Sequence, residues 1–317
     1  MAGIRLEFAQ FGHFDSFDII RSMASTVGVA DVDLPTPIAT GLKSMYYVDT
    51  SVVHGQVYYY KVRVWRGSTS SLSGEIVIVT DTDDYWANVS SLLHFDGADN
   101  STVFTDEKGT IWSRRGSLII SKVQSKFGGS SGRFSKNNYI STNTLAPFLF
   151  GASEDFTIEA WIYVASGASI NDQRVPIVCT GAQDVSAQGG GWALSIIDQS
   201  NAMIHLERYG TNFTAQTAEF RIGSATPRDT WMHVEFGRSN GTTYGFFNGV
   251  LKGTSTTHNN IPFNSPNISN VSIGSGNARL IPNNWHLDGF LDDLRVTKGV
   301  CRHTVNFDVP ARPHPDA

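Results

Sequence analysis

The stretch that decides the fold lies near the end of the chain and reads Trp285-His286-Leu287-Asp288-Gly289-Phe290-Leu291-Asp292-Asp293-Leu294-Arg295-Val296. Apolar and charged residues alternate along it, with an interruption at Gly289. This period of two is typical of a β-strand with one face in a core and the other in water, preceded by a turn. The adjacent carboxylates of Asp292 and Asp293 repel each other, so we expect a nearby cation or a cluster of backbone amides to offset their charge.

A family resemblance becomes visible over residues 289–310, GFLDDLRVTKGVCRHTVNFDVP. This run is similar to the closing motif of laminin-G-like (concanavalin A-like) jelly-roll domains. Its continuation into Asn-Phe-x-x-Pro looks most like the version in tail and virion-surface proteins of bacteriophages. Further segments resemble the same family in the right order between residues 90 and 312, namely LHFDG (93–97), FTIEAWI (156–162), WMHV (231–234), FFNGV (246–250) and Ile273-Gly274. The resemblance implies the fold and is much less specific for a ligand.

Composition agrees with an all-β protein of two domains. The chain has 317 residues, of which 40% are hydrophobic and 17% charged, below the ~25% charged residues of ordinary soluble domains. Gly, Ser, Thr and Asn are abundant, as the many turns of β-sandwiches require. The net charge of −5, without a cluster of Lys and Arg, argues against non-specific nucleic-acid binding.

The sequence also bears on localisation. No run approaches about 18 consecutive apolar residues, so we expect no membrane insertion. The first residues lack the basic region and apolar run of a secretory signal. We therefore expect the protein to stay where it is made, or to leave by lysis or as part of a particle. In that setting Cys179 and Cys301 are expected to be reduced thiols.

Residues 1–82 are predicted to form a first module. Its strongest strand prediction is 57–65, where β-branched and aromatic residues alternate with charged ones. The stretch YYVDTSVVHGQVYYYKVRVW (46–65) resembles fibronectin type III modules, and alignment with that family places the corner tyrosine at Tyr58. The family's first strand and early Trp have no counterpart here. We predict that the edge left unpaired meets a neighbouring subunit.

Residues 83–317 are predicted to form the second domain, and an acidic linker at 81–84 spans the boundary between the two. About a dozen short strand-like segments and no helical periodicity indicate a two-sheet jelly roll. The fold class is therefore all-β, a truncated immunoglobulin-like (fibronectin III) sandwich followed by a concanavalin A-like jelly roll. Apolar positions in the strand-like segments are expected to pack in the core, namely Phe156, Ile158, Trp231, Val234 and Phe246.

The sequence contains no recognisable catalytic motif, and we therefore predict that the protein is not an enzyme. Glucanases of this fold carry Glu-x-Asp-x-(x)-Glu on one strand, and this spacing does not occur. Asp292 and Asp293 are adjacent, so we expect their side chains to point to opposite faces of a strand and not to act as an acid/base pair. Other hydrolase and phosphate-binding motifs are also missing from the sequence.

If the protein binds a metal, we expect it to be Ca²⁺, which prefers carboxylate ligands on loops. The resemblance to laminin-G-like domains implies such a site at the sandwich rim. Asp96 would lie beside Asp292 or Asp293 if the first and last strands pair. The alternative is that these acids cap turns or form ion pairs with arginines, the candidates being Arg295, Arg302 and Arg312.

A glycan site would need an exposed aromatic ring with polar neighbours. The first candidate is Trp285, with Asn283, Asn284 and His286 beside it. Two further candidates are Trp112, next to Arg114 and Arg115, and Tyr209, next to Arg208 and Asn212. For Trp285, binding and core packing both remain open.

Together these patterns predict a non-enzymatic bacteriophage virion protein. The first module would attach it to other virion subunits or to sister copies as a homo-oligomer. The jelly roll would be displayed outward, where it either binds host-surface carbohydrate or only decorates the particle. The alternatives are an exported bacterial carbohydrate-binding or adhesion protein and, less favoured, a glycan hydrolase of the same fold.

Overall fold

The computed structural model describes residues 4–10, 12–52, 56–80, 82–168, 174–182, 191–197, 203–209, 216–223, 227–264, 268–275 and 286–316. None of the helices in these ranges has the length and apolar character that crossing a membrane requires. The chain folds into two compact units, Met1–Trp86 with Pro315–Ala317, and Ala87–His314.

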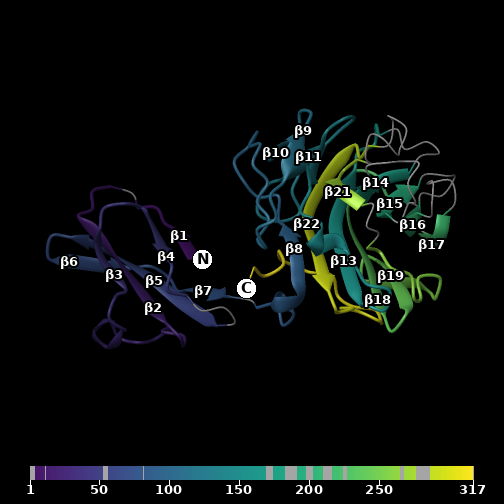
Figure 1. Cartoon of the computed structure of the whole chain (residues 1–317). Coiled ribbons are helices and arrows are strands. Elements are labelled where there is room, and N and C mark those ends of the chain that lie inside the picture. The colour runs from purple at the N-terminus through teal and green to yellow at the C-terminus, as the bar shows by residue number, and fades with distance from the viewer. Residues whose placement is uncertain are drawn as a thin grey trace. The chain divides into compact units, whose positions relative to one another are not determined.

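The first unit contains two antiparallel sheets (Figure 1). One pairs β1 (Ile4–Glu7) with β4 (Tyr46–Asp49). The other has the order β3-β2-β5-β6, and β7 also pairs with β5. Its strands are β2 (Ser16–Ser22), β3 (Ala39–Leu42), β5 (Val57–Arg66), β6 (Thr69–Leu72) and β7 (Ile76–Val79), and a 3-10 turn, η1, spans Asp31–Asp33.

The core of this unit explains the sequence of β5. Tyr58 and Tyr60 point to the same side of the strand because side chains alternate, and both are buried with Leu6 and Ile19. The Tyr60 hydroxyl donates to Asp49 Oδ2 at 2.8 Å, and Arg21 Nη1 donates to the same oxygen at 2.7 Å. Tyr60 lies two residues after the aligned Tyr58. Its hydroxyl ties β5 to the end of β4.

The second unit is a sandwich of an eight-stranded and a seven-stranded sheet (Figure 1). The larger has the order β10-β11-β22-β13-β18-β19-β20, and β8 also pairs with β22. Its strands are β8 (Val89–Leu93), β10 (Ile119–Ser121), β11 (Ser131–Phe134), β13 (Phe156–Val164), β18 (Trp231–Ser239), β19 (Thr242–Phe247), β20 (Val250–Ser255) and β22 (Gly289–Lys298).

The smaller sheet has the order β17-β16-β15-β14-β21-β12-β9. Its strands are β9 (Ser113–Arg115), β12 (Tyr139–Thr142), β14 (Arg174–Ala182), β15 (Trp192–Ile197), β16 (Met203–Tyr209), β17 (Gln216–Gly223) and β21 (Ile268–Ile273). Two 3-10 turns, η2 (Trp86–Asn88) and η3 (Ala146–Phe148), complete the regular structure of the described ranges. This architecture confirms the predicted all-β class and jelly roll, and the first and last strands of the unit pair as expected.

The two sheets bury the alternate residues of their strands against each other. On β13 the residues in this core are Phe156, Ile158, Ala160, Ile162 and Val164. Every residue of β13 except Tyr163 is buried, however, so the outer face of the strand is covered as well. Of the predicted core positions, Phe156, Ile158 and Val234 belong to the inter-sheet core. Phe246 is buried instead on the outer face, where its ring packs against Phe307.

A β-bulge in β22 changes the direction of the acidic pair. Glu159 lies opposite Arg295 and Trp161 lies opposite Asp292, so β22 has one residue more than β13 in this interval. Asp293 has a φ of +52°, and the core side chains before and after the bulge are Leu291 and Leu294. Both aspartates therefore lie on the outer face. The expectation that they point to opposite faces is wrong, because it assumed an unbroken alternation.

The outer face is covered by residues 299–314, which we call the C-terminal strap. Its backbone is tied to β13 where Arg302 N donates to Thr157 Oγ1 at 2.9 Å. Phe307 N donates to Gly249 O at 2.9 Å, and His314 N donates to Asp293 Oδ2 at 2.9 Å. The strap thus spans the sheet from the β19–β20 turn to β22 and turns a strand face that would be solvated into a buried one.

Candidate functional site

A layer of charged and polar side chains lies on the outer face of the eight-stranded sheet, largely beneath the strap. We call it the buried polar layer, and its members are His94, Glu159, His233, Glu235, Asp292, Asp293, Arg295, His303 and His314. Six of these residues stand on the neighbouring strands β13, β18 and β22. Burying so many ionisable groups is costly unless each has a partner of opposite charge or a hydrogen bond.

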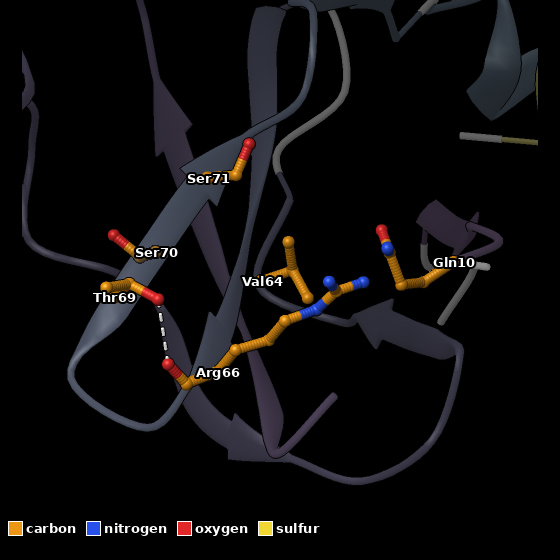
Figure 2. Close-up of a pocket in the computed structure, with 6 residues that line it drawn as sticks. All are labelled: Gln10, Val64, Arg66, Thr69, Ser70 and Ser71. Carbon is orange, nitrogen blue, oxygen red and sulfur yellow. Dashed lines mark hydrogen bonds between the residues drawn. The ribbon is translucent and has the colours of Figure 1, made fainter. Parts of the chain in front are cut away.

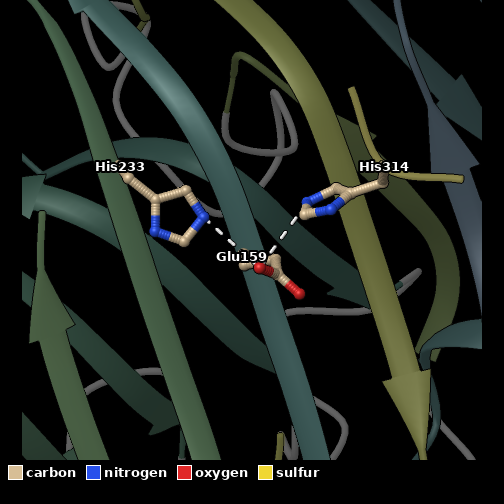
Figure 3. A group of neighbouring side chains, drawn as sticks. All are labelled: Glu159, His233 and His314. Carbon is tan, nitrogen blue, oxygen red and sulfur yellow. Dashed lines mark ion pairs between the residues drawn. The ribbon is translucent and has the colours of Figure 1, made fainter. Parts of the chain in front are cut away.

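Glu159 is the centre of the layer, and its two oxygens have different partners. Oε1 accepts hydrogen bonds from Arg295 Nε at 2.9 Å and Nη2 at 2.8 Å. Oε2 faces His233 Nε2 at 3.3 Å and His314 Nε2 at 3.5 Å (Figure 3). Burial by itself would raise the pKa of Glu159, but the charge of Arg295, followed by the contacts with His314 and His233, outweighs it and holds this pKa well below its usual range. Glu159 is therefore a carboxylate at neutral pH.

The two histidines reach Glu159 from opposite sides, as Figure 3 shows. His233 comes from β18, whose register with β13 brings it next to Glu159. His314 comes from the strap. Burial lowers the pKa of His314 to about 4, although Asp293 and Glu159 act in the opposite direction. Its imidazole is therefore neutral around pH 7.

Glu235 is the second buried glutamate on this face. His303 Nδ1 lies 2.8 Å from its Oε2, and the His303 ring stacks on Phe307 with centroids 3.6 Å apart. Burial raises the pKa of Glu235, the hydrogen bond from His303 opposes this rise, and the charge of Glu159 adds to it. The carboxylate is closed off from solvent by the strap.

The three predicted calcium ligands are near one another but have separate partners. Asp292 Oδ2 accepts from the backbone amides of Lys126 at 2.7 Å and Phe127 at 3.1 Å. Asp293 Oδ1 lies 2.7 Å from His94 Nδ1, and Asp96 Oδ1 accepts from Ser130 Oγ at 3.4 Å. The acids at 292 and 293 thus follow the alternative in which they cap a turn and pair with a cation. The partner of Asp293 is His94, a residue we did not name.

Charge and burial shift the pKa values of the two adjacent aspartates in opposite directions. Burial raises the pKa of Asp292 to about 7, and the charges of Asp293 and Asp96 add to this rise against the two backbone amides. Burial would also raise the pKa of Asp293, but His314 and His94 outweigh it and lower this pKa. Asp293 is consequently the ionised member of the pair in neutral solution.

The structure describes only some of the predicted glycan-binding residues. Trp285, Asn283 and Asn284 lie outside the described residues, and so does the side chain of Tyr209 at the end of β16. His286 is partly buried, with Nδ1 2.9 Å from Ser275 Oγ.

Trp112 is only 8% exposed and packs edge-on against Phe148 with centroids 5.7 Å apart. Its Nε1 donates to Asp106 Oδ2 at 3.2 Å. Its ring is buried among core residues, so Trp112 cannot serve as a sugar platform and that prediction is corrected.

The first unit holds an open, polar pocket of about 340 Å³ (Figure 2). Its lining residues are Gln10, Val64, Arg66, Thr69, Ser70 and Ser71. Thr69 Oγ1 donates to the backbone oxygen of Arg66 at 2.9 Å, which closes the turn between β5 and β6. The pocket was not predicted, because it combines a hairpin with a loop distant in sequence.

In the sequence, Glu159 and His233 are predicted only as parts of strand motifs, and His314 is not predicted as a site residue. The spacing of the first two contained a signal, since alternation puts Glu159 and Trp161 on one face and Trp161 pairs with His233. No local pattern distinguishes His314, which reaches the cluster only through the path of the strap.

Comparison with known proteins identifies the fold. The profile of the concanavalin A-like lectin/glucanases superfamily (Laminin_G_3) matches residues 134–303. No curated protein matches the chain.

Three of the similar solved structures come from two toxins and an arabinanase. The binding domain of Paraclostridial mosquitocidal protein 1 has 14% identity and a TM-score of 0.51, over 69% of this chain and 51% of that one. Domain 4 of an extracellular arabinanase of Geobacillus stearothermophilus, in complex with arabinotriose, has 15% identity and a TM-score of 0.46, over 68% of this chain and 94% of that one. The botulinum neurotoxin serotype D binding domain has 13% identity and a TM-score of 0.48, over 71% of this chain and 49% of that one.

The chain thus spans about half of the first of these structures. At such identities these likenesses concern the fold alone. The profile match covers more than half of the 317 residues and includes β13, β18 and β22. On that match, the chain belongs to the concanavalin A-like lectin/glucanase superfamily.

Proposed function

We propose that this protein is a non-enzymatic, carbohydrate-binding attachment protein of a bacteriophage virion, with the jelly roll as its binding domain. One observation favours a lectin over a glucanase. The carboxylates on the outer face of the eight-stranded sheet are buried, and each is bound to an arginine, a histidine or backbone amides. A glycosidase needs two carboxyl groups that flank a substrate bond, and these four lie beneath other chain segments.

Binding is tested with the whole chain on a glycan array, alongside Trp285→Ala. We expect binding to a restricted set of glycans and its loss in the variant, because a flat aromatic ring supplies most of the contact with a sugar face. Tyr85→Ala is the matched control, since Tyr85 is an exposed aromatic residue away from β1 and β4 in the sequence. An array without any hit, or equal binding by all three proteins, would reject the assignment.

Catalysis is tested separately by incubating the chain with the polysaccharides it binds and measuring new reducing ends. We expect none above a heat-inactivated sample. Release of reducing ends that is abolished by Glu235→Gln would instead make the protein a hydrolase.

Attachment through the first unit is supported by its small sheet. Within the described residues β1 pairs only with β4, so one edge of β1 carries backbone groups that no strand of this unit covers. Tyr46 and Val48 on the neighbouring strand are exposed apolar side chains. Such an edge is a template for another chain. We expect a homo-oligomer in sedimentation velocity, and a monodisperse monomer with protected edge amides would contradict the proposal.

Binding to host cells distinguishes the two roles left open for the displayed domain. A receptor-binding protein adheres to host cells without other virion components. A purely structural subunit co-assembles with tail or capsid proteins and leaves the cells unlabelled.

A further inference from the structure

Three ligand-type atoms converge in the buried polar layer. They are Glu159 Oε2, His233 Nε2 and His314 Nε2, which all lie within 4.8 Å of one another. Two imidazoles and one carboxylate are the donor set that divalent transition metals such as Zn²⁺ prefer. We propose that these three residues bind a divalent transition-metal cation, which fastens the C-terminal strap to the sheet.

Two of the three distances between the ligand atoms are close to those around such an ion. In a tetrahedral zinc site with bonds of about 2.0–2.1 Å, neighbouring ligand atoms are about 3.4 Å apart. Glu159 Oε2 lies 3.3 Å from His233 Nε2 and 3.5 Å from His314 Nε2. The two histidine nitrogens lie within 4.8 Å of each other, and a cation would draw them together.

The same three atoms have unmet bonding capacity. Each is buried, and none of them has a hydrogen-bond partner in the described part of the chain. Buried polar atoms in native proteins are almost always satisfied, because leaving one without a partner costs free energy. One cation would satisfy all three at once. A proton shared by Glu159 and one histidine would leave the other without a partner.

Neighbouring groups orient the proposed ligands, and Asp293 adds a carboxylate oxygen 3.6 Å from His314 Nε2. Both hydrogen bonds from Arg295 to Glu159 end on Oε1, and Oε2 is directed at the histidines. Asn248 Oδ1 accepts from His233 N at 2.8 Å, and Asp293 Oδ2 accepts from His314 N at 2.9 Å. The His233 ring is also held edge-on to Trp161, with centroids 5.2 Å apart. Such surrounding contacts are what holds metal ligands in place.

Charge in the layer can accommodate the ion. Arg295 stands close to the site and opposes a second cation, but the carboxylate of Asp293 lies beside the site and adds to the negative charge of Glu159. The site is enclosed by the sheet and the strap, so the ion would have a structural role. It would join β13 and β18 to a residue at the far end of the strap.

Metal binding is tested on the whole chain after treatment with a chelator. Titration calorimetry with ZnCl₂ is expected to show one saturable site per chain. Saturation at about a hundred times the dissociation constant should raise the melting temperature of the second unit by roughly 5–10 °C. In His233→Ala and in His314→Gln the affinity should fall about 100-fold or more, since each removes a ligand. His13→Ala, which removes an exposed histidine, is the matched control and should bind as the unmutated chain does.

A second measurement decides the matter if the variants do not fold. Long-range ¹H–¹⁵N spectra of the histidine rings in the unmutated chain should show the Nε2 resonances of His233 and His314 shifting together on addition of Zn²⁺. Unchanged ring resonances, no saturable binding, or binding that survives both ligand substitutions would overturn the proposal. The cluster would then be a polar network only.

Discussion

At the scale of single residues, the buried polar layer shows how charges are made tolerable inside a β-sandwich. Glu159 is buried with its Arg295 partner 136 positions away in the sequence, and two hydrogen bonds join them. Buried ion pairs add little compared with apolar packing, but removing one partner leaves a charge without compensation. Individual side chains in this layer should therefore be sensitive to substitution in a way that surface ion pairs are not.

Replacing Arg295 by Met should destabilise the second unit by about 3–5 kcal/mol, because Glu159 would keep its buried charge without its main partner. Arg221→Ala is the control, since Arg221 pairs with Glu219 at a more exposed position and such pairs contribute about 0–1 kcal/mol. Urea unfolding followed by Trp fluorescence measures both. Equal losses in the two variants would show that Arg295 is not a special partner.

Asp292 should make the folded chain less stable as the pH rises, because its pKa is raised in the folded state. Its folded-state pKa is about 7 against an unfolded value of 3.8, so the folded state holds a proton that the unfolded state has lost between these values. This contribution favours folding at low pH and disappears as the pH rises toward 7. Asp292→Asn, which still accepts from the two amides, removes it.

The melting temperature of Asp292→Asn relative to the unmutated chain should therefore rise as the pH is increased from about 4 to about 7 and then level off. Scans at several pH values measure this difference, in which the contributions of other titrating groups cancel. A difference that stays constant with pH would mean that Asp292 ionises freely in the folded state.

At the scale of elements, the closing strand and the strap act as a pair. The bulge in β22 turns both aspartates outward, and Gly289, at the start of the strand, has a φ of +154° where a Cβ would lie 2.0 Å from Tyr163 O. The glycine of the closing motif is thus required by close backbone approach. The strap then covers the outward groups, so the strand is buried on both sides.

Phe307 is the main apolar contact of the strap, and Phe307→Ala should cost about 2–3 kcal/mol, below the cost at a fully buried site because the ring is only partly enclosed. Val305→Ala, in the same strap and 69% exposed, should change stability by less than about 0.5 kcal/mol. Chemical denaturation compares the two variants. Similar small effects would mean that the strap rests on the sheet without stabilising it.

At the scale of the whole molecule, two compact units are joined in one chain, and the larger belongs to a superfamily of lectins and glucanases. The two cysteines of the chain lie in different parts of the larger unit. Cys179 belongs to β14 of the smaller sheet, and Cys301 belongs to the strap outside the larger one. Both are thiols, in agreement with the expected reduced state.

Thiol titration should reflect this arrangement. Cys179 is buried, and burial together with the charge of Glu235 raises the pKa of Cys301 to about 12. The folded chain should therefore react slowly with a thiol reagent such as DTNB at about pH 8, because the thiolate is the reactive form. In urea both thiols should react fully. Fewer than two reactive groups under denaturing conditions would reveal a disulfide.

The sequence by itself determined the all-β class, the jelly roll and the pairing of first and last strands, because alternation and motif order are local properties of the chain. Tertiary structure alone decided what the polar residues do. The bulge at Asp293 reverses the face that strict alternation predicts. Glu159 acquires its partners from strands and a strap far apart in sequence, and Trp112 is buried by contacts that its polar neighbours do not reveal. Such contacts depend on how the sheets and the strap pack, and no local pattern encodes that packing.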